Sequence, residues 1–145
     1  MINTRWFQGR ENLSDALVLR KNVFCNELKT DENLVTDIYD DFAFSLVVYE
    51  DNVPVGTGRL LFKEGKFFAD MVCISEGHRG KNYGDLIVRM IVRKAFDMGA
   101  EKTYAKISKQ YKKLFENIGF EEVSEEDGEI LMMKIGDVGG HCCKH

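Results

Sequence analysis

The spacing of hydrophobic residues changes near Ile74, and this change constrains the fold more than any other feature. Before it lie three runs rich in Val, Leu and Phe, over 44–50, 53–62 and 66–74. Runs of this length and composition predict strands. Asp51 and Asn52 separate the first two runs and Gly65 separates the last two, and both sequences favour tight turns. We therefore predict that this half forms an antiparallel meander.

After Ile74 the chain alternates between helical and strand-like segments. Apolar residues recur at helical spacing over 84–98, and a second helical segment is predicted over 109–118. Strands are predicted over 102–105, 121–123 and 130–135. At the N-terminal end we predict a strand over 4–8 and a helix that Ser14 caps and that runs to about Leu28. The expected fold is α/β (α+β), with a mixed, mostly antiparallel central sheet of six to seven strands flanked by about four helices.

The composition limits the classes of function. A chain of 145 residues with 44% hydrophobic residues is sufficient for one core, and we expect a single domain over 1–136 followed by a tail over 137–145. A net charge of −4 argues against general binding to nucleic acid or to an anionic membrane. No membrane span or signal peptide is evident, so we expect a cytoplasmic protein with reduced cysteines.

A glycine-containing loop, Arg79-Gly80-Lys81-Asn82-Tyr83-Gly84, joins the third predicted strand to the helix over 84–98. The start of a helix offers unpaired backbone N–H groups and a partial positive charge, which suit a pyrophosphate. Arg79 and Lys81 add full charges. The loop lacks the Gly-Lys-Ser/Thr of a P-loop and does not fit the dinucleotide pattern G-x-G-x-x-G.

This loop resembles the pyrophosphate loop of the GNAT superfamily of acyl-CoA-dependent N-acyltransferases, Arg/Gln-x-x-Gly-x-Gly/Ala. Asn82 replaces one glycine, and because asparagine tolerates a left-handed backbone, we expect the loop to keep its shape. A second family signature is similar to Leu114-Phe115-Glu116-Asn117-Ile118-Gly119-Phe120, and the likeness runs from the first strand to Ile135. It implies acetyl-CoA as cosubstrate, no required metal, and a binding site made of Val72, Cys73, Ile74, Arg79, Gly80, Lys81, Asn82, Tyr83, Gly84, Asp85 and Ser108.

The resemblance also implies how the reaction would run. In the family the third long strand splays from its neighbour, so the backbone at Val72-Cys73-Ile74 would bind the pantetheine and polarise the thioester carbonyl. The family's usual acid is a tyrosine, but Phe115 stands at that position. Tyr111, one helical turn earlier, is the candidate acid, or else it only packs with its hydroxyl at the edge.

Asp70 is the candidate base, because it shares strand parity with Val72 and Ile74. The alternative is a solvent-facing aspartate, and Glu64, which lies in a turn, is a weaker candidate. Ser108 replaces the family's asparagine and could still bond the pantetheine. Cys73 could serve as a nucleophile, but packing in the strand is the preferred interpretation because direct transfer needs no nucleophile.

Two other regions carry charged or metal-binding residues. Arg20 lies on an apolar helix face, which predicts that it pairs with a carboxylate at the edge of the core. The tail holds soft ligands for Zn or Cu(I), although adjacent cysteines fit one tetrahedral ion poorly, and a flexible tail without function is the alternative. These ligands are His141, Cys142, Cys143 and His145.

The expected function is acetyl transfer from acetyl-CoA to an unidentified amine acceptor. The acidic residues Asp37, Asp40 and Asp41 are a candidate attractor for a cationic acceptor, or else they are merely solvated. A non-catalytic acyl-CoA-binding module or regulator is the alternative, because Phe115 and Ser108 replace two family groups. A metal-responsive regulator built on the tail is a third possibility. The sequence leaves a homodimer open.

Overall fold

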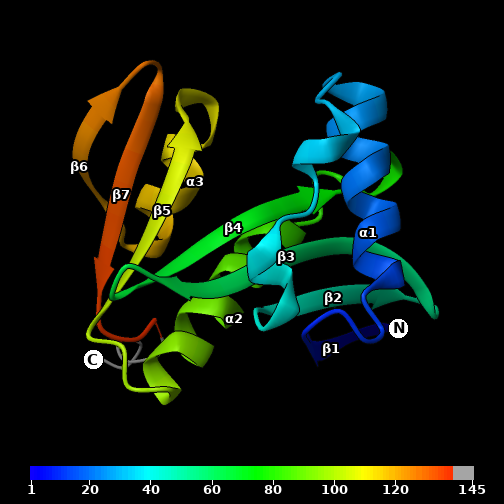
Figure 1. Cartoon of the computed structure of the whole chain (residues 1–145), viewed down its shortest axis with the longest axis horizontal. Coiled ribbons are helices and arrows are strands. Elements are labelled where there is room, and N and C mark those ends of the chain that lie inside the picture. Colours follow the sequence, from blue (N-terminus) through cyan, green and yellow to red (C-terminus); the bar gives the residue numbers. More distant parts are fainter. Residues whose placement is uncertain (139–145) are drawn as a thin grey trace.

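The computed structural model describes residues 1–138, which form one seven-stranded sheet with helices on both faces (Figure 1). The strands lie in the order β1-β2-β3-β4-β5-β7-β6. Their bounds are β1 Ile2–Gln8, β2 Phe44–Glu50, β3 Val53–Lys63, β4 Lys66–Ile74, β5 Lys102–Ser108, β6 Glu121–Glu126 and β7 Glu129–Ile135. The helices are α1 Ser14–Arg20, α2 Tyr83–Asp97 and α3 Lys112–Ile118.

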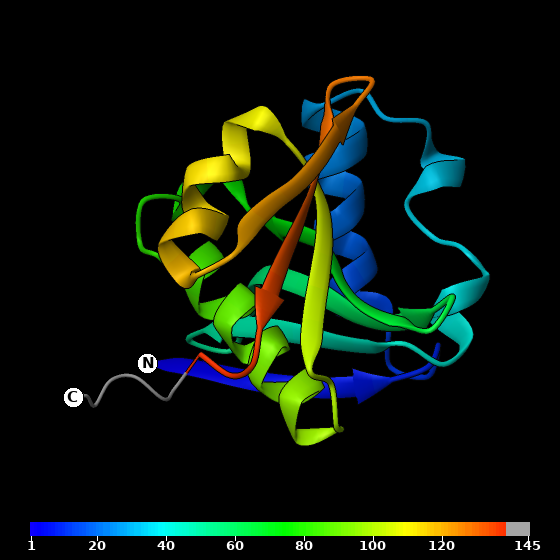
Figure 2. The ribbon, with the colours of Figure 1, turned by 90° about the vertical axis from the view of Figure 1, so that its left-hand side faces the viewer.

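The predicted mixed sheet is confirmed. Every neighbouring pair of strands is antiparallel except β4 and β5, which are parallel. Helix α1 lies on one face, whereas α2 and α3 lie on the other (Figures 1 and 2). The described residues contain three α-helices rather than about four, because the remaining helical segments are single 3-10 turns or a continuation of α1.

The β2–β3 turn follows the prediction closely. Asp51 and Asn52 both adopt positive φ angles, of 51° and 70°. Two consecutive left-handed residues match the right-handed twist of the flanking strands, and Asn and Asp tolerate this conformation better than most residues. The turn chemistry therefore fixes the register of the meander that leads into β4.

Helix α1 departs from the prediction at both ends. Leu13 rather than Ser14 is the N-cap residue, and no side chain caps the first turn. After Arg20 the backbone continues as a π-helical segment, Lys21–Glu27. Such segments are rare and often occur at functional sites. This one brings Val23, Phe24 and Glu27 to a cavity described below.

Among the described residues, three of the four apolar clusters join the helices to the sheet. Helix α2 packs Ile87 and Ile91 against Leu46 and Leu60 of the meander, while Phe115 and Ile118 of α3 pack with strands β5 and β7. On the opposite face, Ala16 and Leu19 of α1, with its N-cap residue Leu13, join a cluster that includes Cys73. Among the described residues, no helix is long and apolar enough to cross a membrane.

Strands β4 and β5 part soon after they meet. Within the described residues they are paired only through Phe67 with Thr103 and Phe68 with Tyr104. Beyond Phe68, β4 remains paired with β3 on its other side. The backbone edge that faces β5 is thus left without a strand partner from Ala69 onward, and such an edge offers free N–H and C=O groups.

Candidate active site

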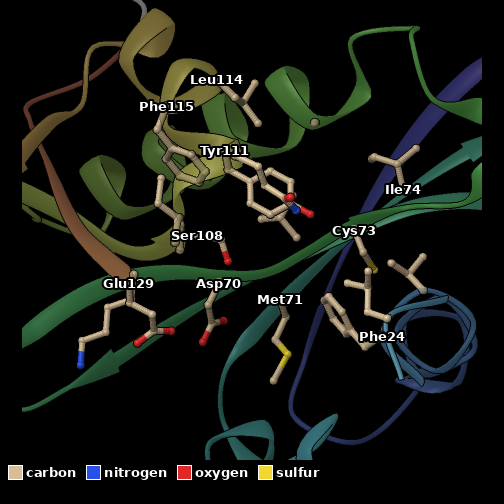
Figure 3. Close-up of a pocket in the computed structure, with 18 of the residues that line it drawn as sticks. Phe24, Asp70, Met71, Cys73, Ile74, Ser108, Tyr111, Leu114, Phe115 and Glu129 are labelled. Carbon is tan, nitrogen blue, oxygen red and sulfur yellow. The ribbon is translucent and has the colours of Figure 1, made fainter. Parts of the chain in front are cut away.

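A cavity of about 520 Å³ lies where β4 and β5 diverge. Most of the predicted site residues line it, namely Asp70, Val72, Cys73, Ile74, Arg79, Gly84, Ser108 and Tyr111. The others, Gly80, Lys81, Asn82, Tyr83 and Asp85, belong to the adjoining loop and the first turn of α2. The tertiary structure therefore gathers residues from β4, the loop, β5 and the segment before α3 around one space (Figure 3).

The loop adopts the backbone conformation predicted for it. Asn82 has φ 66° and ψ 23°, in the left-handed region, and it is the N-cap residue of α2. Gly80 has φ 84°, with open space where a Cβ would stand. Helix α2 begins at Tyr83, so its first backbone N–H groups are available beside the cavity. The left-handed backbone expected of Asn82 from the sequence is thus present.

The two cations of the loop are both paired with carboxylates. Arg79 donates to the carbonyl oxygen of Ile74, at 2.8 Å from Nη2, and to Glu27, at 2.7 Å. Lys81 lies 3.1 Å from a carboxylate oxygen of Glu50. Tyr83 also donates to Glu50, and this hydrogen bond raises the pKa of Tyr83 to about 12. The carboxylates hold the loop side chains in place and reduce the free positive charge.

A β-bulge decides where Asp70 points. The β3–β4 register shifts between Thr57 and Arg59, and Met71 has a φ of 53°. A bulge adds one residue and reverses the alternation of faces. Val72 and Ile74 pack against the cluster of α2, whereas Asp70 bonds to Arg59, away from α2. The parity argument made from the sequence is therefore wrong, although Asp70 does line the cavity.

Asp70 belongs to a network with two buried arginines. Arg59 donates to both carboxylate oxygens of Asp70, at 2.8 and 2.7 Å, and also to Asp37 and Asp40. Arg20 donates two further hydrogen bonds of 3.2 Å to Asp40. The predicted partner of Arg20 is thus a buried carboxylate. Asp37 and Asp40 accept hydrogen bonds from these arginines, so their contacts do not support the prediction that they attract a cationic acceptor.

Burial and ion pairing act in opposite directions on these carboxyl groups. Burial raises the pKa of Asp70 above its usual value, although the Arg59 guanidinium opposes the rise. For Asp40, burial also favours the neutral form, but hydrogen bonding and attraction to Arg20 and Arg59 hold its pKa below the usual range. Asp70 keeps 32% of its side chain exposed, whereas Asp40 is fully buried. Among the carboxyl groups Asp37, Asp40 and Asp70 of this network, Asp70 alone combines a raised pKa with a place in the cavity lining.

The second signature places an aromatic cluster above the cavity. Phe115 is buried, and its ring packs edge-on against Phe120 at 5.0 Å between centroids. Tyr111 is 42% exposed and reaches over the cavity from the side of α3 (Figure 3). Ser108, at the end of β5, also lines it. Both Tyr111 and Phe115 line the cavity, but Tyr111 is the more exposed of the two and carries a hydroxyl.

Cys73 has the properties of a packing residue. It is 5% exposed and belongs to the cluster beneath α1. Burial raises the pKa of its thiol to about 12. Since the thiolate is the nucleophilic form of cysteine, Cys73 is unsuited to form an acyl intermediate.

The chain matches a known family along most of its length. The model of the Acetyltransferase (GNAT) family matches residues 11–120. The chain belongs to the GNAT acetyltransferase family. The uncharacterized N-acetyltransferase YjcF of Bacillus subtilis (strain 168) is 27% identical over 120 residues, which cover 83% of this chain and 86% of the relative.

Solved structures have the same GNAT fold. An acyl-CoA N-acyltransferase from Pseudomonas aeruginosa superposes with a TM-score of 0.79 at 22% identity, covering 92% of this chain and 99% of that one. A PaiA N-acetyltransferase from Thermoplasma acidophilum, solved in complex with coenzyme A, gives a TM-score of 0.71 at 12% identity, covering 93% and 99%. The overall fold of this chain is thus shared with these solved structures.

Several cavity residues of this GNAT chain escaped prediction from the sequence. Phe24 and Glu27 come from the π-helical segment, Met71 from the bulge, and Lys106 and Glu129 from β5 and β7. No local motif marks them, because they are brought to the cavity by the bulge and by strand pairing.

The proposed tail ligands, His141, Cys142, Cys143 and His145, lie outside the described residues. Within residues 1–138, no group of three or more His, Cys, Asp or Glu side chains is arranged to hold a metal ion.

Proposed function

We propose that this protein transfers the acetyl group of acetyl-CoA to a primary amine by direct attack in a ternary complex. The observation that carries the proposal is the cavity at the parting of β4 and β5, which adjoins the start of α2. The start of a helix suits a pyrophosphate, and the unpaired strand edge beside it suits a pantetheine chain. The family to which the chain belongs uses acetyl-CoA, which supplies the reactive thioester.

The residues divide into two groups by location. The loop Arg79–Gly84 and the first turn of α2, with Asp85, would cradle the pyrophosphate through backbone N–H groups. The unpaired edge of β4 at Val72-Cys73-Ile74 would bond the pantetheine, with Ser108 across the gap. A backbone N–H aimed at the thioester carbonyl would stabilise the negative charge that develops on its oxygen.

The proton transfers are assigned to Asp70 and Tyr111. An ammonium has no free lone pair, so Asp70 accepts a proton from the acceptor, directly or through water. The amine nitrogen then forms the C–N bond, the C–S bond breaks, and the leaving thiolate takes a proton from Tyr111. The second proton that the nitrogen loses restores the Tyr111 hydroxyl through water, so that the net release is the one proton held by Asp70. Asp70 on the α1 side and Tyr111 on the α3 side flank the gap from opposite faces (Figure 3).

Release of free thiol from acetyl-CoA, with a panel of amino acids, polyamines and peptides, tests this function. The expected result is release that requires both the protein and an amine, with N-acetylated product by mass spectrometry. Asp70→Asn and Tyr111→Phe should each lower kcat by about 10²-fold or more while CoA affinity stays within about twofold. CoA binding without thiol release across the panel would favour a non-catalytic acyl-CoA-binding module, for which the buried Phe115 at the usual acid position is the supporting observation.

A further inference from the structure

The charged side chains that line the cavity fall into two sets. Asp70 is held by Arg59, and Glu27 is held by Arg79. Lys106 and Glu129 also line the cavity, and both are exposed; neither side chain makes a hydrogen bond or ion pair with any of the residues 1–138. One unpaired cation and one unpaired anion thus face the same space.

Strand register puts these two charges on one face of the sheet. Ser108 lies opposite Glu129, and Lys106 lies two residues before Ser108, so all three side chains share a face. Lys106 and Glu129 are therefore diagonal neighbours across β5 and β7, a separation of about 7–8 Å between Cα atoms in such pairs. A ligand that carries both charges a few bonds apart can contact both side chains at once.

This face is the one opposite the CoA loop. Asp70 and Glu129 project to the same side of β4, together with Met71 and Phe24, whereas Tyr111 projects from the other side (Figure 3). Along this side Figure 3 shows Glu129, Asp70, Met71 and Phe24 in that order, so the apolar side chains of Met71 and Phe24 line the cavity beyond Asp70. An acceptor on this side reaches the gap between β4 and β5 without crossing the α2 and α3 layer.

We propose that this face is the acceptor subsite and that it selects an apolar α-amino acid, with Glu129 binding the ammonium and Lys106 the carboxylate. The proposal rests on the proposed function, because the bound amine is the one that would be acetylated. Glu129 acts as a positioning residue for the amine, while Asp70 takes its proton. The apolar side chain of the acceptor packs on Phe24 and Met71.

The test compares leucine with isoamylamine, which is leucine without its carboxylate. In the wild-type protein, kcat/KM should be about fivefold higher for leucine, the upper worth of one exposed ion pair. Lys106→Met should raise KM for leucine by about fivefold and leave isoamylamine unchanged. Glu129→Gln should raise KM for both amines, with kcat nearly unchanged for both.

Lys109 and Glu125 supply matched controls. They form an exposed ion pair of 3.1 Å close to the same strands, and neither lines the cavity. Lys109→Met and Glu125→Gln should leave kcat and KM unchanged for both leucine and isoamylamine. Equal or better turnover of isoamylamine, or a Lys106→Met effect that is the same for both amines, overturns the proposal. The proposal is also overturned if other amines are acetylated but neither leucine nor isoamylamine is.

Failure of the proposed function gives a different result. If the wild-type protein binds CoA but releases thiol with no amine, calorimetry of leucine with the CoA-loaded protein decides the subsite. Leucine binding that Lys106→Met and Glu129→Gln weaken, and that the Lys109→Met control keeps, supports the subsite. Absence of leucine binding overturns it.

Discussion

Removing one partner of the buried ion pair between Arg20 and Asp40 should greatly lower the free energy of unfolding of this protein. Both side chains are fully buried, and Asp40 accepts from Arg20, Arg59 and the backbone N–H of Asp37. Asp40→Asn removes the negative charge and leaves two guanidinium groups short of a partner. Removing one partner of a buried pair costs about 3–5 kcal/mol because the other charge remains desolvated.

The effect is measurable by thermal and denaturant unfolding. For a chain near this size, about 2–4 °C of melting temperature is lost per kcal/mol, so Asp40→Asn should melt about 10 °C lower. The control is Asp41→Asn, which breaks the exposed pair of Asp41 with Arg10, exposed by 60% and 49%. That pair should be worth less than about 1 kcal/mol.

The pH dependence provides a second check. Because the folded-state pKa of Asp40 lies below its usual value, the carboxylate stabilises the fold above its unfolded-state pKa. This contribution is lost as the pH falls through the folded-state pKa. The stability gap between wild type and Asp40→Asn should therefore shrink below about pH 4. A loss of less than about 1 kcal/mol at neutral pH, or a gap that widens in acid, would refute the reasoning.

Three further outcomes are expected. Cys73→Ala should keep kcat within about threefold because a thiol with a pKa near 12 is no nucleophile, and peptide mapping after alkylation should find native Cys73 unmodified. Asn82→Val should lower stability by about 1–2 kcal/mol and weaken CoA binding, whereas Asn82→Gly should preserve both, since only the β-branched residue resists the left-handed backbone. Glu27→Gln should tighten CoA binding at low salt but not at high salt, because it removes the carboxylate paired with Arg79; unchanged affinity at low salt would contradict this.

Local sequence was sufficient to predict the loop and its surroundings. The left-handed Asn82, the turn at Asp51 and Asn52, and the order of strand, loop and helix depend on residues that are near one another in the chain. Backbone preferences and hydrophobic period act over a few residues, so these features could be predicted without a model of the whole molecule. The pairing of Arg20 with a carboxylate followed from the cost of burying a lone charge.

Long-range pairing decided the rest. No residue near Asp70 in the chain predicts the bulge at Met71, because the bulge depends on how β4 pairs with β3. With this bulge, Asp70 lies on the α1 side of the sheet and bonds to Arg59. Glu129 is distant in sequence from the loop, and it enters the cavity only because β7 pairs with β5. The conformation of the loop Arg79–Gly84 was therefore local, whereas the face that carries Lys106 and Glu129 was built by register between strands, which one residue of slip would reverse.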